Sequence, residues 1–84
     1  MIDPSIERYW EGFVAGHRVA EEECDRPDAL DYLSGPKLAD FMVLKWNSSG
    51  LAEAVLGFVD GVLACFPREE ISEWLALSCG MGLA

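Results

Sequence analysis

The stretches GFVAG at residues 12–16 and GFVDG at residues 57–61 are nearly identical and lie 45 positions apart. Each has two glycines four residues apart inside a segment that otherwise favours a helix. A glycine inside a helix costs about 1 kcal/mol relative to alanine, but small residues at this spacing let two helices approach closely. We therefore predict a packing seam, either between two helices of one chain or across the two-fold axis of a dimer. Its members are Gly12, Gly16, Gly57 and Gly61.

Two other interpretations of the repeated letters are weaker. A duplicated helix pair would also repeat them, but five letters are little support for a duplication. A phosphate-binding loop would need a lysine after the glycines and a strand before them. The sequence has no such lysine at either stretch. Helix packing is therefore the preferred interpretation.

A helix is predicted from Pro4 to about Cys24. Asp3 can cap it, proline suits its first position, and Glu7 lies near the positive end of its dipole. At the helical period one stripe collects Ile6, Tyr9, Trp10, Phe13, His17, Ala20 and Cys24. This stripe is expected to face the core, with the charged residues on the other side.

The middle of the chain predicts two shorter helices. The first runs from Pro27 to Leu33 and is expected to stop at SGP, and the second begins at Pro36. Its residues FMVLKW would also suit a strand, but no partner strand is evident, so a helix is preferred. NSSG at 47–50 reads as a turn, with Ser49 as a candidate cap for the next segment.

Residues 51–66, LAEAVLGFVDGVLACF, allow two interpretations. Asp-Gly between apolar residues is a strong hairpin signal. A hairpin here would have apolar residues on both faces, whereas a helix would place one narrow polar stripe on an otherwise apolar surface. That stripe holds Glu53, Gly57, Asp60 and Ala64. A mostly buried central helix is therefore preferred.

A last helix is predicted from Pro67, with Glu69 and Glu70 in its first turn and Gly80 as its stop. The expected fold of residues 1–84 is thus one all-α domain, a compact bundle of four to five short helices.

Composition limits the classes of function. The net charge of −9 repels phosphates, which argues against direct binding of nucleic acid and favours a basic partner. The charge could also serve only to keep the protein soluble. A hydrophobic content of 51% is high for 84 residues and leaves room for an apolar interface, including a homodimer.

The expected location is the cytoplasm. No signal peptide or membrane-spanning stretch is evident, so no membrane role is expected. Three cysteines without a Cys-x-x-Cys pair indicate reduced thiols.

Few residues offer chemistry. His17 is the only histidine, and its place in the apolar stripe favours a hydrogen-bonded core or interface residue over a catalytic base. A zinc site or an activated nucleophile would need further partners that the spacing does not supply. No enzyme activity, metal or cofactor is therefore expected.

The acidic run EEECDRPDALD at residues 21–31 is the better candidate for a functional site. It has six acids against one arginine, and three of them crowd the negative end of the first helix, where lysine would be more stable. The candidate partner-binding residues are Glu21, Glu22, Glu23, Asp25, Asp28 and Asp31. Calcium binding is a weaker alternative, because the ligand spacing and central glycine of a calcium loop are missing. The run could also be a solvated face beside a turn, without any binding function.

This run, with Glu7, Glu11, Glu69, Glu70 and Glu73, gives the chain a profile that resembles the small acidic proteins with which phages disable host nucleic-acid machinery, above all anti-CRISPR proteins. The resemblance covers the general profile and no motif. It implies a stoichiometric inhibitor that binds a basic, nucleic-acid-binding surface of a protein or nucleoprotein complex. The alternative is a homodimeric structural or regulatory module.

Overall fold

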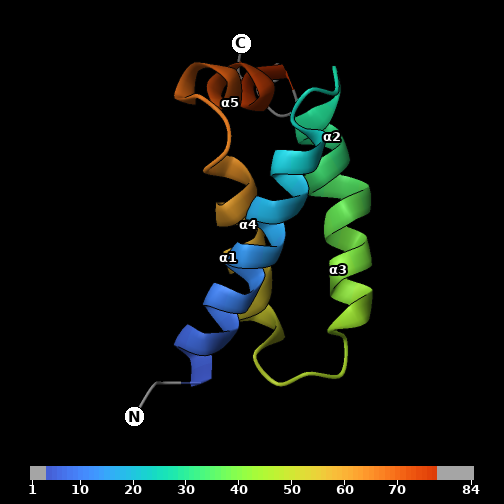
Figure 1. The fold of residues 1–84 in the computed structure, drawn as a ribbon, viewed down its shortest axis with the longest axis vertical. Coiled ribbons are helices and arrows are strands. Elements are labelled where there is room, and N and C mark those ends of the chain that lie inside the picture. The colour runs from blue at the N-terminus through green and yellow to red at the C-terminus, as the bar shows by residue number, and fades with distance from the viewer. Residues whose placement is uncertain (1–3, 78–84) are drawn as a thin grey trace.

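The structure, a computed structural model, describes residues 4–77, and these residues form helices and turns without a strand. The elements are α1 (Pro4–Glu23), α2 (Ala29–Tyr32), a π-helical turn η1 (Leu33–Lys37), α3 (Leu38–Leu44), α4 (Leu51–Leu63) and α5 (Arg68–Leu75) (Figure 1). The predicted all-α class is confirmed, and the stretch from 51 is the helix α4 rather than a hairpin.

The fold is organised around α1 and α4, which lie side by side and run in the same direction (Figure 1). Gly12 of α1 lies against the backbone of α4, where an added Cβ would be 1.9 Å from the Ala54 carbonyl oxygen. Gly57 of α4 lies against α1 in the same way, because a Cβ added to it would be 1.9 Å from the Tyr9 carbonyl oxygen. A side chain at either position would push the two backbones apart, so the contact requires glycine.

The second glycine of each pair repeats this arrangement one turn later. A Cβ at Gly16 would lie 2.2 Å from the Phe58 carbonyl oxygen, and one at Gly61 would lie 2.2 Å from that of Phe13. Phe13 and Phe58 are 45 positions apart, as are the glycines themselves. The two helices are therefore related by a pseudo-two-fold axis that runs between them, and the glycine seam is formed within one chain.

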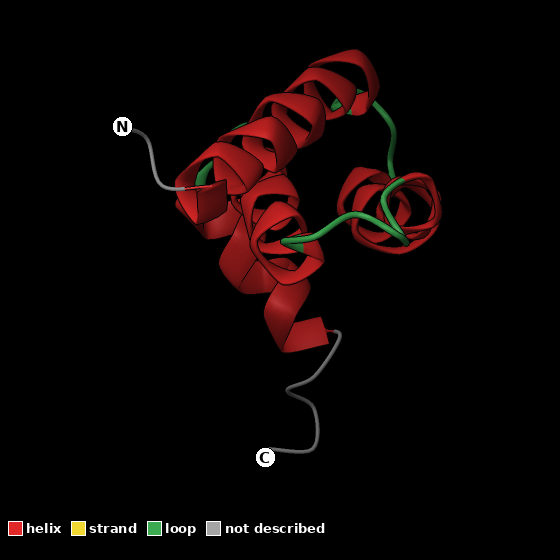
Figure 2. Cartoon of the chain, turned by 90° about the horizontal axis from the view of Figure 1, so that it is seen from below, coloured by secondary structure: helices red, strands yellow, loops and turns green. Residues whose placement is uncertain are grey.

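The hydrophobic core lies on one side of this pair. The continuous helical segment 29–44 packs there, and no element of the described residues covers the opposite side (Figure 2). The Phe41 ring of α3 sits on the Phe58 ring of α4, with 4.8 Å between the centroids, and Phe58 is only 2% exposed. The buried core residues are Ala20, Ala29, Leu30, Leu33, Phe41, Ala54, Phe58, Val62 and Phe66.

The helix expected to stop at SGP continues instead. Pro36 lies inside η1, and the Leu38 N–H points to the Leu33 carbonyl, five residues back. A proline lacks an N–H and crowds the preceding turn, and the wider π-turn makes room for it. Gly35 has no Cβ to clash with the proline ring, and the Ser34 hydroxyl donates to the Leu30 carbonyl at 2.6 Å. The predicted break at SGP is therefore wrong.

The predicted core stripe of α1 needs a correction. The buried residues of α1 are Gly12, Gly16 and Ala20, whereas Ile6 and Trp10 are each 52% exposed. Cys24, at the end of the same stripe, is also exposed. The glycine seam, rather than the large apolar residues, faces the partner helix because close backbone approach stabilises this contact.

The predicted polar stripe of α4 is likewise only partly correct. Glu53 is half-buried, Asp60 and Ala64 are exposed, and Gly57 is buried against α1. Leu56 is 61% exposed, so the outer face of α4 is less polar than the sequence suggests.

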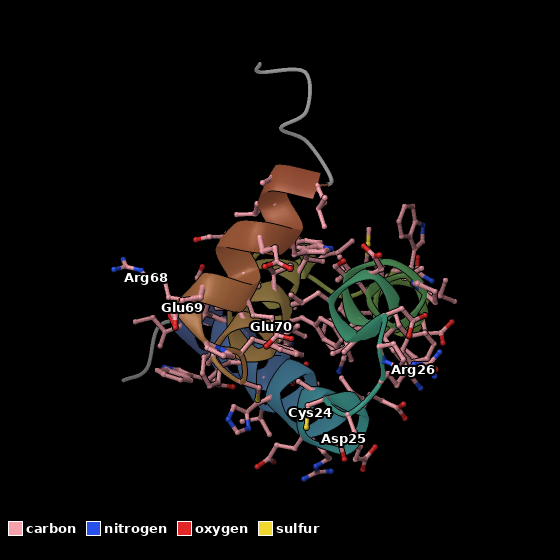
Figure 3. The ribbon with its side chains drawn as sticks, turned by 90° about the horizontal axis from the view of Figure 1, so that it is seen from above. Cys24, Asp25, Arg26, Arg68, Glu69 and Glu70 are labelled. Carbon is pink, nitrogen blue, oxygen red and sulfur yellow. The ribbon has the colours of Figure 1, made fainter. Side chains whose placement is uncertain are left out.

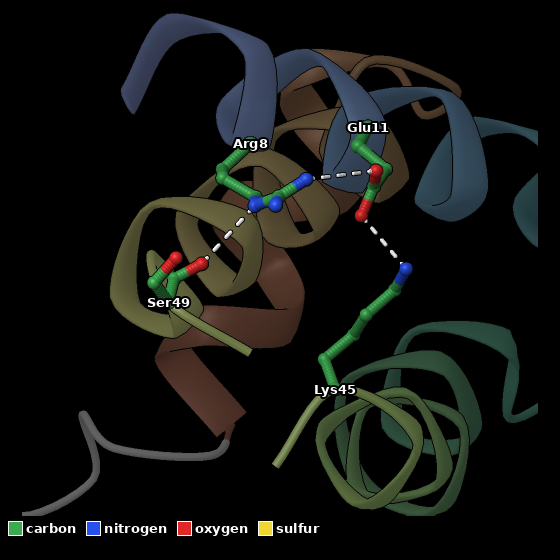
Figure 4. Close-up of polar contacts among 4 residues, drawn as sticks. All are labelled: Arg8, Glu11, Lys45 and Ser49. Carbon is green, nitrogen blue, oxygen red and sulfur yellow. Dashed lines mark hydrogen bonds and ion pairs between the residues drawn. The ribbon is translucent and has the colours of Figure 1, made fainter. Parts of the chain in front are cut away.

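The start of α4 is fixed without the predicted Ser49 cap. The N-cap is Gly50, whose φ of +80° is in the left-handed region that favours glycine. The Ser49 carbonyl accepts a hydrogen bond from Arg8 Nε at 3.1 Å. Glu11 pairs with Lys45 Nζ at 2.7 Å and with Arg8 Nη1 at 3.4 Å, which connects α1 to the end of α3 (Figure 4).

Other predicted helix boundaries agree with the structure. α1 ends at Glu23, and Pro67 is the N-cap of α5, with Glu69 and Glu70 in its first turn. Asp3, Cys79, Gly80 and the last residues lie outside the described part of the chain.

Candidate functional site: the acidic end of the bundle

Two acidic segments that are far apart in the sequence meet at one end of the bundle. The turn after α1 and the helix α5 both lie there, with Cys24–Arg26 and Arg68–Glu70 on the same end surface (Figure 3). We call residues 21–31 and 68–73 together the acidic end. They hold nine acidic and two basic residues, a net charge of −7 out of −9 for the chain. The charge is therefore concentrated at one end.

Among the described residues, one side-chain hydrogen bond connects α5 to the acidic run. Trp74 Nε1 of α5 donates to Asp31 Oδ1 of α2 at 2.7 Å, and the Trp74 and Ile71 side chains pack on the edge of the core. Pro67, with φ −66° and ψ 151°, is extended and turns the chain so that α5 returns across the end of the bundle (Figure 1). The hydrogen bond of Trp74 thus holds α5, with its carboxylates, beside the acidic run.

A cavity of about 200 Å³ opens between the two segments. Residues 27–31 form one wall and α5 forms the other. Four carboxylates border the cavity, together with the apolar side chains of Trp74 and Leu77. The carboxylates belong to Asp28, Asp31, Glu70 and Glu73. Such a mixed lining suits the charged head and apolar stem of an arginine or lysine.

Arg26 neutralises part of the acidic run. Its guanidinium lies 3.0 Å from Asp28 Oδ1 and 3.5 Å from Glu23 Oε1, and it covers the Tyr32 ring at 3.7 Å from the ring centroid. The hydrogen bond from Arg26 lowers the pKa of the Asp28 carboxyl below its ordinary value, because it stabilises the ionised form. Glu23 and Asp28 therefore have structural partners within the chain.

The other acids at this end differ in what they contact. Glu21 Oε1 lies 3.5 Å from His17 Nδ1, and Asp31 holds Trp74. The remaining carboxylates form no ion pair with another residue between 4 and 77, and all are exposed. They are Glu22, Asp25, Glu69, Glu70 and Glu73. These five are the carboxylates best placed to contact an external cation.

The candidate residues predicted from the sequence thus fall into two groups. Glu22 and Asp25 have no cationic partner in the described chain. The other four take part in internal contacts: Glu21, Glu23, Asp28 and Asp31. That α5 joins the site could not be predicted from the sequence, because it depends on one long-range bond between side chains 43 residues apart.

The described residues offer little for other chemistry. Between residues 4 and 77, no three or more metal-ligating side chains are grouped so as to hold a metal ion. His17, for which a core or interface position was expected, is half-buried and stacks on Phe13 outside the core cluster. Cys24 and Cys65 are free thiols, and burial raises the pKa of Cys65, which keeps that thiol protonated.

Replacing Trp74 with phenylalanine tests how α5 is held. The variant keeps an aromatic ring, smaller than the indole, but cannot donate to Asp31. We therefore expect the lost hydrogen bond to lower the free energy of unfolding by about 0.5–1.5 kcal/mol, the smaller ring to lower it further, and amide hydrogen exchange in α5 to become faster. Exchange in α1 and α4 measures whether the rest of the bundle is unchanged. Equal protection of α5 in the wild type and the variant would show that the bond does not hold the helix.

None of the described helices is both long and apolar enough to cross a membrane. Comparisons of the chain with protein-family models, with curated proteins and with solved structures found no match in any of the three.

Proposed function

We propose that this protein is a non-enzymatic inhibitor that places its acidic end on a basic, nucleic-acid-binding surface of a partner protein or nucleoprotein complex. Such a protein would act in the manner of the phage anti-CRISPR proteins that its acidic profile resembles. The observation that carries the proposal is the meeting of two acidic segments at one end, where five exposed carboxylates form no ion pair with any residue from 4 to 77. A charge that served only solubility would not need to be concentrated in this way.

The geometry of the acidic end suits electrostatic docking. Exposed carboxylates attract a basic surface over about 10 Å at moderate salt, and they set the orientation in which it approaches. Carboxylates can occupy the places at which the partner would otherwise hold phosphates. The cleft between residues 27–31 and α5 adds a recess for an arginine or lysine side chain.

A homodimeric regulatory module is the alternative. Its main support was the pair of glycine strips, but Gly12, Gly16, Gly57 and Gly61 are already packed within one chain. They are not available to a second copy without separating α1 from α4.

The proposal is tested by affinity capture from a host lysate at low and high salt, with and without a DNA or RNA competitor. We expect a captured protein that binds nucleic acid, that is released by high salt, and that is displaced by the competitor. The matched control is a bait in which Glu22, Asp25 and Glu70 are replaced by their amides. Capture that is equal for both baits and indifferent to salt and competitor would reject the inhibitor.

A further inference from the structure

The pseudo-two-fold axis between α1 and α4 gives the helix pair two equivalent grooves on opposite sides. One groove holds the core: Phe58 lines it, and α3 covers it through Phe41. We call this the covered groove. The axis relates Phe58 to Phe13, which lies in the opposite groove. No described element packs there (Figure 2), and we call it the open groove.

The open groove is lined by aromatic side chains of α1. The Tyr9 and Trp10 rings meet edge to face at 5.4 Å, Trp10 and Phe13 at 5.1 Å, and His17 stacks on Phe13 at 6.0 Å. None of these four side chains belongs to the core cluster. A row of four rings with half of Trp10 in solvent is an interface-like surface, because Trp and Tyr dominate the energetics of protein interfaces.

The charge of the open groove comes from the two helices that border it. Asp60 of α4 accepts a hydrogen bond from the Tyr9 hydroxyl and so lies beside the aromatic row. Glu21 lies near His17 at the other end, where a shallow hollow of about 280 Å³ is also bordered by Arg18. The rim of the open groove therefore includes two carboxylates and one guanidinium among the described residues. Aromatic rings beside carboxylates attract cations.

The covered groove shows what fits between these two helices. There, α3 inserts Phe41 against Phe58 and extends Lys45, one turn later, to Glu11 on α1 at 2.7 Å. Two residues four positions apart on one helix thus make both contacts: the aromatic ring packs on the apolar base of the groove, and the lysine pairs with a carboxylate at its edge. The open groove is formed by the same two helix backbones, and it likewise places aromatic side chains beside a carboxylate, that of Asp60.

We propose that the open groove binds an amphipathic helix of a partner protein, which presents an aromatic or large aliphatic residue and, one turn away, a lysine or arginine. The apolar residue packs on Phe13 and Trp10, and the cation pairs with Asp60 or stacks on the Trp10 ring. This surface shares only Glu21 with the acidic end, and the residues that would bind the helix, Phe13, Trp10 and Asp60, lie outside that end. The inference therefore goes beyond the proposed function and does not depend on it.

The test uses the whole chain labelled with ¹⁵N and a synthetic helical peptide with phenylalanine and lysine four residues apart. Two matched peptides replace the lysine with glutamate or the phenylalanine with alanine. We expect the amide shifts of residues 9–17 and of Asp60 to move with the first peptide only. Trp10→Ala should weaken its binding at least about tenfold, while the control Trp46→Ala, at a tryptophan that is 64% exposed beyond α3, should change it less than about twofold.

Several results would overturn the inference. Equal binding of the glutamate peptide would remove the charge argument, and equal effects of Trp10→Ala and Trp46→Ala would place binding elsewhere. Shifts of the groove that depend on protein concentration without peptide would show that a second copy covers it, and contacts from residues 78–84 would show that the chain covers it itself. If the wild-type protein did not bind the first peptide, this inference would be wrong, but capture of a partner by the acidic end would be unaffected. The two proposals therefore fail separately.

Discussion

Gly57→Ala is expected to destabilise the protein by about 3 kcal/mol or more, even though alanine is the better helix former. The added Cβ would lie 1.9 Å from the Tyr9 carbonyl oxygen, and this atom belongs to the backbone and cannot rotate away. Relief requires α1 and α4 to separate along the whole seam, which removes close packing from the centre of the fold. The measurement is equilibrium unfolding in urea at neutral pH.

Gly12→Ala should cost a similar amount, because the pseudo-two-fold axis gives it the same clash with the Ala54 carbonyl oxygen. Ala52, which is exposed on α4, provides the control: Ala52→Gly should lose only about 1 kcal/mol through helix propensity. If Gly57→Ala raised the free energy of unfolding, helix propensity would outweigh packing and the seam would not exist as described.

Much of the α1–α4 pair could be predicted from the sequence because its signal is local. Two glycines four residues apart within helical segments have few explanations other than close packing, and the 45-residue repeat matches the register of the two helices. The sequence did not distinguish contact within one chain from contact in a dimer. The length and direction of the connection through residues 24–50 decide that, and they depend on how the whole chain packs.

The outward position of the α1 aromatics could not be predicted from hydrophobic periodicity. That method assigns the largest apolar residues to the core, and it scores a glycine face as neutral. In this protein, close approach at Gly12 and Gly16 determines the orientation of α1, and Ile6 and Trp10 turn to solvent as a result. In a helix that has one face of glycines and another of aromatic residues, either face can therefore be the one that packs against the neighbouring helix.

The break predicted at SGP failed for a related reason. Proline and glycine usually end helices, but here the burial of Leu33 and Phe41 on either side of Pro36 favours one continuous helical segment. The π-turn accommodates the proline at low cost. Tertiary packing overrode a correct local rule.

The acidic site was only half visible in the sequence. The run at 21–31 is local and easily found, whereas its junction with Glu69, Glu70 and Glu73 depends on the turn at Pro67 and on the Trp74–Asp31 bond. The sequence also could not show that Arg26 occupies Glu23 and Asp28. The structure thus moves the expected contact surface from the run itself to its exposed members and α5.

The second large effect concerns where the negative charge acts. Two variants each remove three negative charges, so that their net charge is equal. One variant replaces three carboxylates of the acidic end by their amides: Glu22, Asp25 and Glu70. The other replaces three remote carboxylates in the same way: Glu7, Asp40 and Glu53. Exposed or half-buried side chains are replaced in both, so both are expected to stay folded.

Binding of these two variants to the captured partner, measured by titration calorimetry at several salt concentrations, tests the central claim most directly. We expect the acidic-end variant to bind at least about tenfold more weakly than the wild type and with a smaller dependence on salt, because contacts between charges carry the interaction. The remote variant should stay within about twofold of the wild type. Equal losses for the two variants would show that only total charge matters, and unchanged affinity for both would contradict an electrostatic docking surface at this end of the bundle.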